Sequence, residues 1–245
     1  MIHPVPKEGT GSGTHIDAPH ISLQRKANGA THGTGRGTHS SGKGSLFVAT
    51  DYGKMTENLI RFYDFTDKEV LFIGAASRQL LDPSTRVKKL IAIDKDAAAL
   101  RQLEEKIAAE GLQGRVEVVA SDFGDVRVQA DVVYFEFCLH EMDDPEKALT
   151  HAKSLASDIV VYDHSSGSEW IYYGAEEDKV VLSSAAMERF GIRRQQKFVA
   201  EQRFPTYQEL LAKVEPQEPV AVERARRFEG ANNIVIPMAY ELNLL

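Results

Sequence analysis

The sequence predicts an α/β protein with a mostly parallel sheet, helices on both faces of that sheet and an antiparallel hairpin at its C-terminal edge. Short apolar runs alternate with helical segments between residues 51 and 164, and this alternation is typical of a parallel sheet covered by helices. Two extended segments near the C-terminus, residues 197–204 and 232–242, are expected to pair with each other. Pro237 in the second segment favours a bulge or an edge position, because proline lacks the N–H that a ladder needs.

The first helix is expected to follow Asp51, whose carboxylate can accept hydrogen bonds from the backbone of the first turn. Further helices are expected over residues 97–112, where Gly111 favours the end, and over residues 145–156, where Pro145 suits the first turn. The apolar positions of the first helix crowd one side, as in a helix packed on a core: Met55, Leu59, Ile60, Phe62 and Tyr63.

Short apolar runs have the length and composition of strands that are buried on both faces. They are residues 69–74, 90–96, 116–123, the start of 131–142, and 158–164. Ligands of open α/β sheets bind at the carboxyl ends of the strands. The residues that end these runs are therefore the candidates for a functional site.

The N-terminal segment, residues 1–45, has a different composition from the rest of the chain. It is rich in Gly, Ser, Thr and His and cannot bury enough apolar surface to offset the entropy of ordering. We predict a flexible tail, with a lid over a ligand or a metal-binding arm as alternatives. Its histidines lack the regular spacing of a specific metal site, and no metal site is predicted for the chain: His3, His15, His20, His32 and His39.

The composition also argues against several partners and compartments. The formal net charge is −7 with Lys and Arg spread along the chain, whereas a nucleic-acid partner needs a local positive footprint. Cys138 is the single cysteine, so nothing requires an oxidising compartment. No apolar run approaches the roughly 20 residues that span a bilayer, and the N-terminus lacks the order of a signal peptide. We expect a soluble, cytoplasmic protein without a membrane or nucleic-acid partner, and its oligomeric state is left open.

The ends of the first two runs carry features of a nucleotide site. The first run ends in Gly74, followed by Ala75, Ala76 and Ser77, and these small residues let a ligand approach the backbone closely. The second run ends in Asp94, 20 residues after Gly74. A carboxylate at that place can accept hydrogen bonds from ribose hydroxyls.

The ends of the third and fourth runs add acidic and aromatic residues. Asp122 can meet an adenine amino group, or it can instead cap the following turn, and Phe123 can flank the base. Glu136 ends the fourth run, where a carboxylate is costly unless it is paired or faces a site. His140 follows, as a candidate for catalysis or as a histidine hydrogen-bonded beneath the site, and Cys138 is most simply a small apolar filler.

The fifth run ends in Asp163 and His164, at the place where a substrate would lie. We treat His164 as a candidate general base, and His140 and Glu136 as further catalytic candidates. Tyr52, Trp170 and Tyr173 are the candidate substrate-binding residues, because an aromatic wall favours a cationic or flat ligand. Ordinary helix packing by these bulky side chains is the alternative.

Four segments in order and spacing, VLFIGAAS, IAIDKD, VVASDF and DVVYFEFCLHEMDDPEKAL, resemble the class I S-adenosylmethionine-dependent methyltransferases. The resemblance covers roughly residues 50–165, and the C-terminal hairpin suits the antiparallel edge of that family. It implies a Rossmann-like, seven-stranded sheet and a methyltransferase domain over residues 46–245.

The resemblance also implies S-adenosylmethionine as the cofactor. Gly74 and the three residues after it would contact the methionine end, Asp94 the ribose, and Asp122 with Phe123 the adenine. Lys95 and Glu136 are counted with them as cofactor-binding candidates.

The function that we expect is methyl transfer to a nitrogen, oxygen, sulfur or carbon atom of a small molecule. The alternatives are an NAD(P)-dependent oxidoreductase, a non-catalytic S-adenosylmethionine-binding protein and a protein methyltransferase. The single glycine of the first loop argues against the oxidoreductase, because a pyrophosphate needs close backbone approach along that whole turn.

Overall fold

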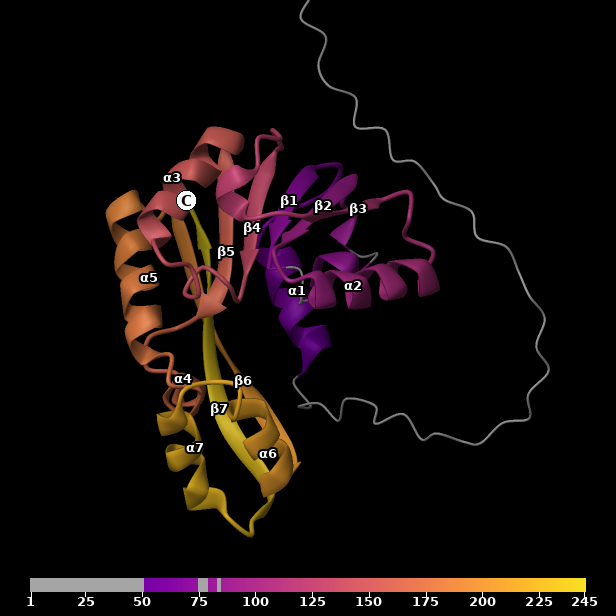
Figure 1. The fold of residues 1–245 in the computed structure, drawn as a ribbon. Helices are drawn as coiled ribbons and strands as arrows, with labels where there is room; N and C mark the ends of the chain where they lie inside the picture. Colours follow the sequence, from indigo (N-terminus) through magenta and orange to yellow (C-terminus); the bar gives the residue numbers. More distant parts are fainter. Residues whose placement is uncertain (1–50, 75–78, 83–84) are drawn as a thin grey trace, which may run out of the picture. The chain divides into compact units, whose positions relative to one another are not determined.

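The sheet of the protein has seven strands in the order β3-β2-β1-β4-β5-β7-β6 (Figure 1). Strands β1 to β5 run parallel, whereas β7 is antiparallel to both β5 and β6. The predicted fold class, including the antiparallel hairpin, is therefore confirmed. The strands are β1 Glu69–Ile73, β2 Lys89–Asp94, β3 Val116–Ala120, β4 Val132–Glu136, β5 Asp158–His164, β6 Arg194–Thr206 and β7 Asn232–Leu244.

The computed structural model describes residues 51–74, 79–82 and 85–245. The expectations for residues 1–45, and those for Ala75, Ala76 and Ser77, lie outside the described residues. Within the described part of the chain, no helix is long and apolar enough to cross a membrane.

Successive side chains of the central strands point to opposite faces of the sheet, and they form one apolar layer on each face. Val70 and Phe72 of β1 face one layer, whereas Leu71 and Ile73 face the other. Helices α1 and α2 cover the first face, together with α4, α6 and α7, and helices α3 and α5 cover the second. Both faces of β1, β4 and β5 are thus buried, which explains their nearly continuous apolar runs.

The helices begin where the sequence places capping residues. Asp51 Oδ1 accepts a hydrogen bond from Lys54 N at 3.0 Å, and Pro145 occupies the first turn of α3. The helices are α1 Tyr52–Phe62, α2 Ala97–Ala109, α3 Pro145–Leu155, α4 Glu169–Gly174, α5 Glu177–Phe190, α6 Tyr207–Val214 and α7 Pro219–Ala225. Short 3₁₀ turns are η1 Gln79–Leu81, η3 Phe123–Asp125 and η4 Arg226–Phe228.

The C-terminal hairpin is longer than the strand that it joins. Strand β7 pairs with β5 only over residues 240–244, whereas its pairing with β6 covers nearly its whole length. Pro237 lies in the part of β7 that, among the described strands, pairs with no strand other than β6. At this residue β7 is therefore an edge strand, as predicted, although further along it lies between β5 and β6. Helices α6 and α7 occur in the connection between β6 and β7, and α6 packs on both strands.

Candidate functional site

A cleft opens at the carboxyl ends of β1 to β4, and we call it the strand-end cleft. It contains five of the residues predicted to bind a cofactor: Gly74, Asp94, Lys95, Asp122 and Phe123. The other described residues that line it are Ile73, Ile93, Ser121, Cys138, Glu141 and Met142. The parallel strands therefore bring these separate parts of the sequence to one place.

Gly74 lies at the bottom of this cleft in a conformation that only glycine adopts easily. Its φ is +83°, and a Cβ at this position would lie 2.8 Å from Cys138 Cβ and 2.9 Å from Cys138 Sγ. The same Cβ would also lie 3.1 Å from the backbone oxygen of Glu136. The end of β1 thus packs directly on the segment that follows β4, without a side chain between them.

Asp94 ends β2 with one carboxylate oxygen engaged by the backbone. Its Oδ1 accepts a hydrogen bond from Asp96 N at 2.9 Å, which fixes the carboxylate at the start of the turn into α2. The Oδ2 atom makes no hydrogen bond within the described residues. Asp94 is partly exposed in the cleft, so this oxygen can accept a hydrogen bond from a bound hydroxyl.

Asp122 and Phe123 form the side of the cleft at the end of β3. Asp122 Oδ1 accepts a hydrogen bond from Gly124 N at 2.8 Å, so this residue does cap the following turn while it also lines the cleft. The ring of Phe123 is buried and contacts Phe135 and His151 edge to face, with centroid distances of 5.3 and 4.9 Å. These contacts hold the aromatic ring in place at the cleft wall.

A second cavity, which we call the histidine cavity, lies beside the first cleft and has a volume of about 310 Å³. It contains four of the residues predicted to bind substrate or act in catalysis: Tyr52, His140, His164 and Trp170. Glu141 lines both spaces, so the segment after β4 separates them. The other lining residues are Met55, Phe137, Glu176, Gln202, Lys213, Gln217 and Met238.

His140 is fixed by Asp163, which ends the neighbouring strand. Its Nδ1 lies 2.5 Å from Asp163 Oδ1, and its backbone N donates to Asp163 Oδ2 at 3.1 Å. Burial alone would lower the pKa of His140, but the negative charge and hydrogen bond of Asp163 outweigh it and raise this pKa to about 10. Asp163 Oδ1 also accepts from His164 N at 2.8 Å, so one carboxylate orients the backbone or side chain of both histidines.

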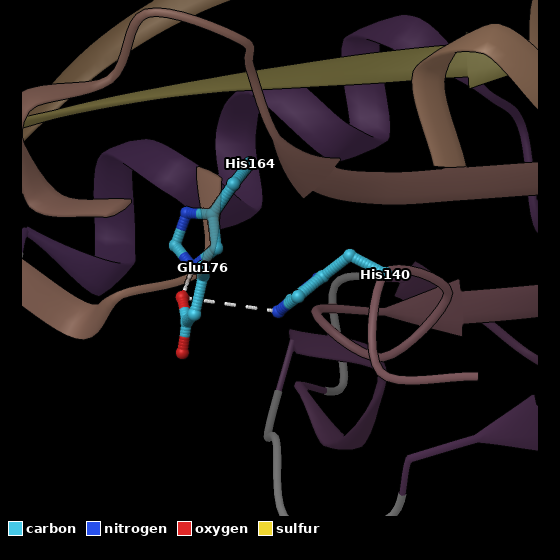
Figure 2. Close-up of side chains that lie close together, drawn as sticks. All are labelled: His140, His164 and Glu176. Carbon is cyan, nitrogen blue, oxygen red and sulfur yellow. Dashed lines mark ion pairs between the residues drawn. The ribbon is translucent and has the colours of Figure 1, made fainter. Parts of the chain in front are cut away.

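His164 and Glu176 lie opposite His140 in the same cavity (Figure 2). Glu176 Oε2 is 3.8 Å from His164 Nε2 and 3.9 Å from His140 Nε2. Burial lowers the pKa of His164 to about 4, and burial raises the pKa of Glu176. Glu141 is different, because hydrogen bonds from His140 and Lys179 outweigh its partial burial and lower its pKa to about 2.

Unusual backbone conformations place these side chains. Phe137 has a φ of +49°, which turns the chain sharply after β4 and sends it toward His140. Ala175 has a φ of +57° and ends α4, directly before Glu176. A Cβ on Gly174 would lie 3.0 Å from the carboxyl carbon of Glu176, so the missing side chain makes room for that carboxylate.

Two predicted site residues are not among the described residues that line either space. Glu136 is 2% exposed at the end of β4, where its negative charge contributes, after burial, to the raised pKa of Tyr134. Tyr173 is fully buried, and its hydroxyl accepts a hydrogen bond from Arg227 at 2.6 Å. The geometry therefore supports a packing role for Tyr173, which was the alternative for these aromatic residues.

Several cavity residues have no signal in the sequence that would single them out. Glu176, Lys213 and Gln217 come from segments without a recognisable motif, and only the folded chain brings them beside the histidines. Glu141 is an exception, because it stands in the segment after the fourth strand that already drew attention to His140.

Comparisons with known proteins agree with the fold. Residues 72–157 match the model of a family described as a methyltransferase domain. The YcgJ protein from Bacillus subtilis has a TM-score of 0.57 at 13% identity, with 78% of this chain and 96% of that chain covered. A SAM-dependent methyltransferase from Aquifex aeolicus has a TM-score of 0.51 at 19% identity, with 82% and 90% covered.

A third similar structure is that of a protein named for a different activity. The precorrin 8w decarboxylase from Methanobacterium thermoautotrophicum has a TM-score of 0.51 at 11% identity, and the match covers 78% of this chain and 89% of that chain. A search of curated protein sequences finds no significant match. Structural likeness at such low identity shows the fold alone.

Proposed function

We propose that the chain is a class I S-adenosylmethionine-dependent methyltransferase and that it methylates a small molecule bound in the histidine cavity. The observation that carries the proposal is that the two spaces are adjacent. Glu141, in the segment that follows β4, lines both the strand-end cleft and the histidine cavity. A cofactor in the first space and an acceptor in the second would therefore lie next to each other, as a direct transfer requires.

The strand-end cleft has the side chains that an adenosyl cofactor needs. The residues that would hold it are Asp94 for the ribose and Asp122 with Phe123 for the adenine, while Gly74 leaves the end of β1 without a side chain. Lys95 lines the same cleft. When bound, S-adenosylmethionine supplies an electrophilic methyl group on a sulfonium sulfur.

The contribution of the chain is positioning and exclusion of water. Trp170 is 6% exposed and stacks on Phe204, so it forms a rigid wall for an acceptor. Tyr52 is half exposed at the start of α1 and lines the histidine cavity, and we propose that it covers the bound acceptor. We propose that the reacting end of the acceptor lies on the side of the cavity formed by His140 and His164.

The size and charge of the cavity support a small molecule as the acceptor. A volume of about 310 Å³ is at the lower end of what drug-sized ligands occupy. Lys213 and Gln217 lie at its edge and can bind an anionic or polar group. The formal net charge of −7 gives no general attraction for nucleic acid.

The experiment is a transfer assay with methyl-labelled S-adenosylmethionine and three separate acceptor pools, namely small metabolites, proteins and RNA. We expect label in the metabolite pool. Label confined to protein or RNA would contradict the proposal. Because Lys213 is exposed at the cavity, Lys213→Gln should raise the KM for the acceptor without unfolding the protein, whereas Lys153→Gln on the outer surface of α3 should not.

A further inference from the structure

We propose that His140, His164 and Glu176 form a binding site for a divalent transition-metal ion in the wall of the histidine cavity. Each residue offers one ligand atom, and these atoms all lie within 4.8 Å of one another. They come from the segment after β4, the end of β5 and the residue before α5, so the fold and not the sequence brings them together (Figure 2).

The distances suit a shared ion better than direct contacts. The separations of 3.8 and 3.9 Å between Glu176 Oε2 and the two Nε2 atoms are too long for hydrogen bonds. Two ligands that are each about 2.1 Å from one zinc ion are roughly 3–3.5 Å apart. The two nitrogen–oxygen separations exceed this range by only a few tenths of an ångström, and the ligand atoms all lie within 4.8 Å of one another, so side-chain adjustment would bring them into coordination.

Burial supplies a second, independent argument. The three residues are 4%, 6% and 7% exposed, and Glu176 Oε2 makes no hydrogen bond within the described part of the chain. A buried carboxylate oxygen without a hydrogen bond is costly, and a bound cation would offset that cost. The figure shows this oxygen directed at the two histidines.

Asp163 gives His140 the environment that metal-bound histidines have. A ligating histidine almost always donates its other ring N–H to a carboxylate or carbonyl, which fixes the tautomer and the ring orientation. Asp163 Oδ1 accepts from His140 Nδ1 at 2.5 Å, and a bound metal ion would replace the proton on Nε2, which lies 3.4 Å from Glu141 Oε1 and 3.9 Å from Glu176 Oε2. Asp163 is thus a positioning residue for the metal site.

The absence of a side chain at Gly174 makes room for the carboxylate of Glu176, the third proposed ligand. A Cβ there would be 3.2 and 3.3 Å from the two carboxylate oxygens of Glu176, which is closer than such contacts normally are. Gly174→Ala should push the carboxylate from its position while leaving the ligand residues themselves unchanged. This variant therefore tests the geometry of the site rather than its composition.

The donor set selects the class of ion. Imidazole nitrogens suit Zn²⁺, Fe²⁺ and related ions, whereas Mg²⁺ and Ca²⁺ prefer oxygen ligands. Two histidines and one carboxylate leave coordination positions open, and all three residues line the cavity. In an inference that rests on the proposed function, the open positions would bind an oxygen atom of the acceptor, so the substrate class is a hydroxyl- or carboxylate-bearing small molecule.

The test is titration of the metal-free full-length protein with Zn²⁺ by calorimetry, repeated with Co²⁺ by visible absorption, and with Mg²⁺ as a contrast. We expect a micromolar or tighter Zn²⁺ site that Glu176→Gln weakens at least 100-fold and that Mg²⁺ does not occupy. Asp163→Asn and Gly174→Ala should each weaken it roughly 10–100-fold. Circular dichroism would establish that each variant is folded.

The histidines of the N-terminal segment require their own control. His32→Asn together with His39→Asn should leave the Co²⁺ absorption unchanged. Equal Zn²⁺ affinity in the wild type, Glu176→Gln and Gly174→Ala would overturn the proposal, because the metal would then bind elsewhere. Absence of any Zn²⁺ binding would overturn it as well.

The acceptor class has a separate probe. Acetohydroxamate binds metals through two oxygen atoms, and it should alter the absorption of the Co²⁺-loaded protein if open positions face the cavity. An unchanged spectrum would contradict the acceptor class. These measurements need neither S-adenosylmethionine nor methyl transfer, so failure of the metal site and failure of the proposed function are distinguishable.

Discussion

Gly74 at the end of β1 lies so close to Cys138 that a Cβ on the glycine would be 2.8 Å from the Cβ of the cysteine. The Sγ of Cys138 in turn lies 3.2 Å from the backbone oxygen of Ile73. The glycine is therefore required by packing within the protein itself. It also keeps the centre of the strand-end cleft free of a side chain.

Gly74→Ala should destabilise the protein by about 2–4 kcal/mol, because strain at a positive φ adds to overpacking against Cys138. Gly114→Ala is the matched control, since a Cβ there meets nothing within 4 Å. Urea unfolding of both variants measures the difference in the free energy of unfolding. Equal free energies of unfolding would contradict this prediction, because the segment after β4 would then have moved to accommodate the added Cβ.

Tyr240→Phe tests the attachment of α1 to the sheet. Asn58 Nδ2 donates a buried hydrogen bond of 2.9 Å to Tyr240 Oη, and the variant leaves that donor without its partner. The free energy of unfolding should fall by about 1–3 kcal/mol. In a double-mutant cycle, Asn58→Leu with Tyr240→Phe should cost less than the sum of the two single changes. Strict additivity would contradict the inferred bond.

Asp158 should make stability depend on pH in the acid range. Burial opposes ionisation, but hydrogen bonds from Arg193 and Tyr63, each 2.7 Å long, outweigh it and lower the pKa of Asp158. Because this pKa is lower in the folded than in the unfolded state, the contribution is complete above about pH 4 and is lost as the pH falls through the lowered pKa.

Asp158→Asn should therefore destabilise the protein by about 1–2 kcal/mol at pH 7, and its difference from the wild type should shrink as the pH falls below about 4. Denaturant unfolding between pH 7 and pH 3 measures this. Glu188→Gln on the exposed face of α5 serves as the control. A difference that stays constant with pH would contradict the assignment.

The two aromatic residues Tyr52 and Tyr173 should behave in opposite ways. Tyr52 lines the histidine cavity and is 51% exposed, so Tyr52→Ala should raise the KM for the acceptor about 5- to 20-fold with little change in stability. Tyr173→Phe removes the bond from Arg227 and should lower stability by about 1 kcal/mol without changing that KM. Steady-state kinetics and thermal unfolding separate the two outcomes.

Much of the fold could be predicted from the sequence because its signals are local. The run from Val70 to Ile73 and the cap at Asp51 depend on residues a few positions apart, and the structure confirms both. Asp94 could be predicted to lie near Gly74 because the two residues follow or end neighbouring parallel strands, 20 residues apart in the chain.

The cavity could be predicted only in part, because its residues meet through long-range packing. His140 and His164 stand at strand ends, where the sequence already directs attention, whereas Glu176 depends on the left-handed turn at Ala175. Trp170 and Tyr173 are both aromatic residues of the same predicted segment, so the sequence does not distinguish their roles. The orientation of the short helix α4 determines that Trp170 lines the cavity and Tyr173 does not. Periodicity over six residues is too short to decide this.

The most direct measurement is calorimetric titration of the protein with S-adenosylmethionine, S-adenosylhomocysteine and NAD, alongside Asp94→Asn. Asparagine keeps the Oδ1 that accepts from Asp96 N but replaces the free carboxylate oxygen with a donor, and Glu105→Gln on the exposed face of α2 is the control. We predict micromolar binding of both adenosyl compounds, weakened at least 10-fold by Asp94→Asn only, and no binding of NAD. Adenosyl binding that is absent, or indifferent to Asp94→Asn, would contradict the proposed cofactor site.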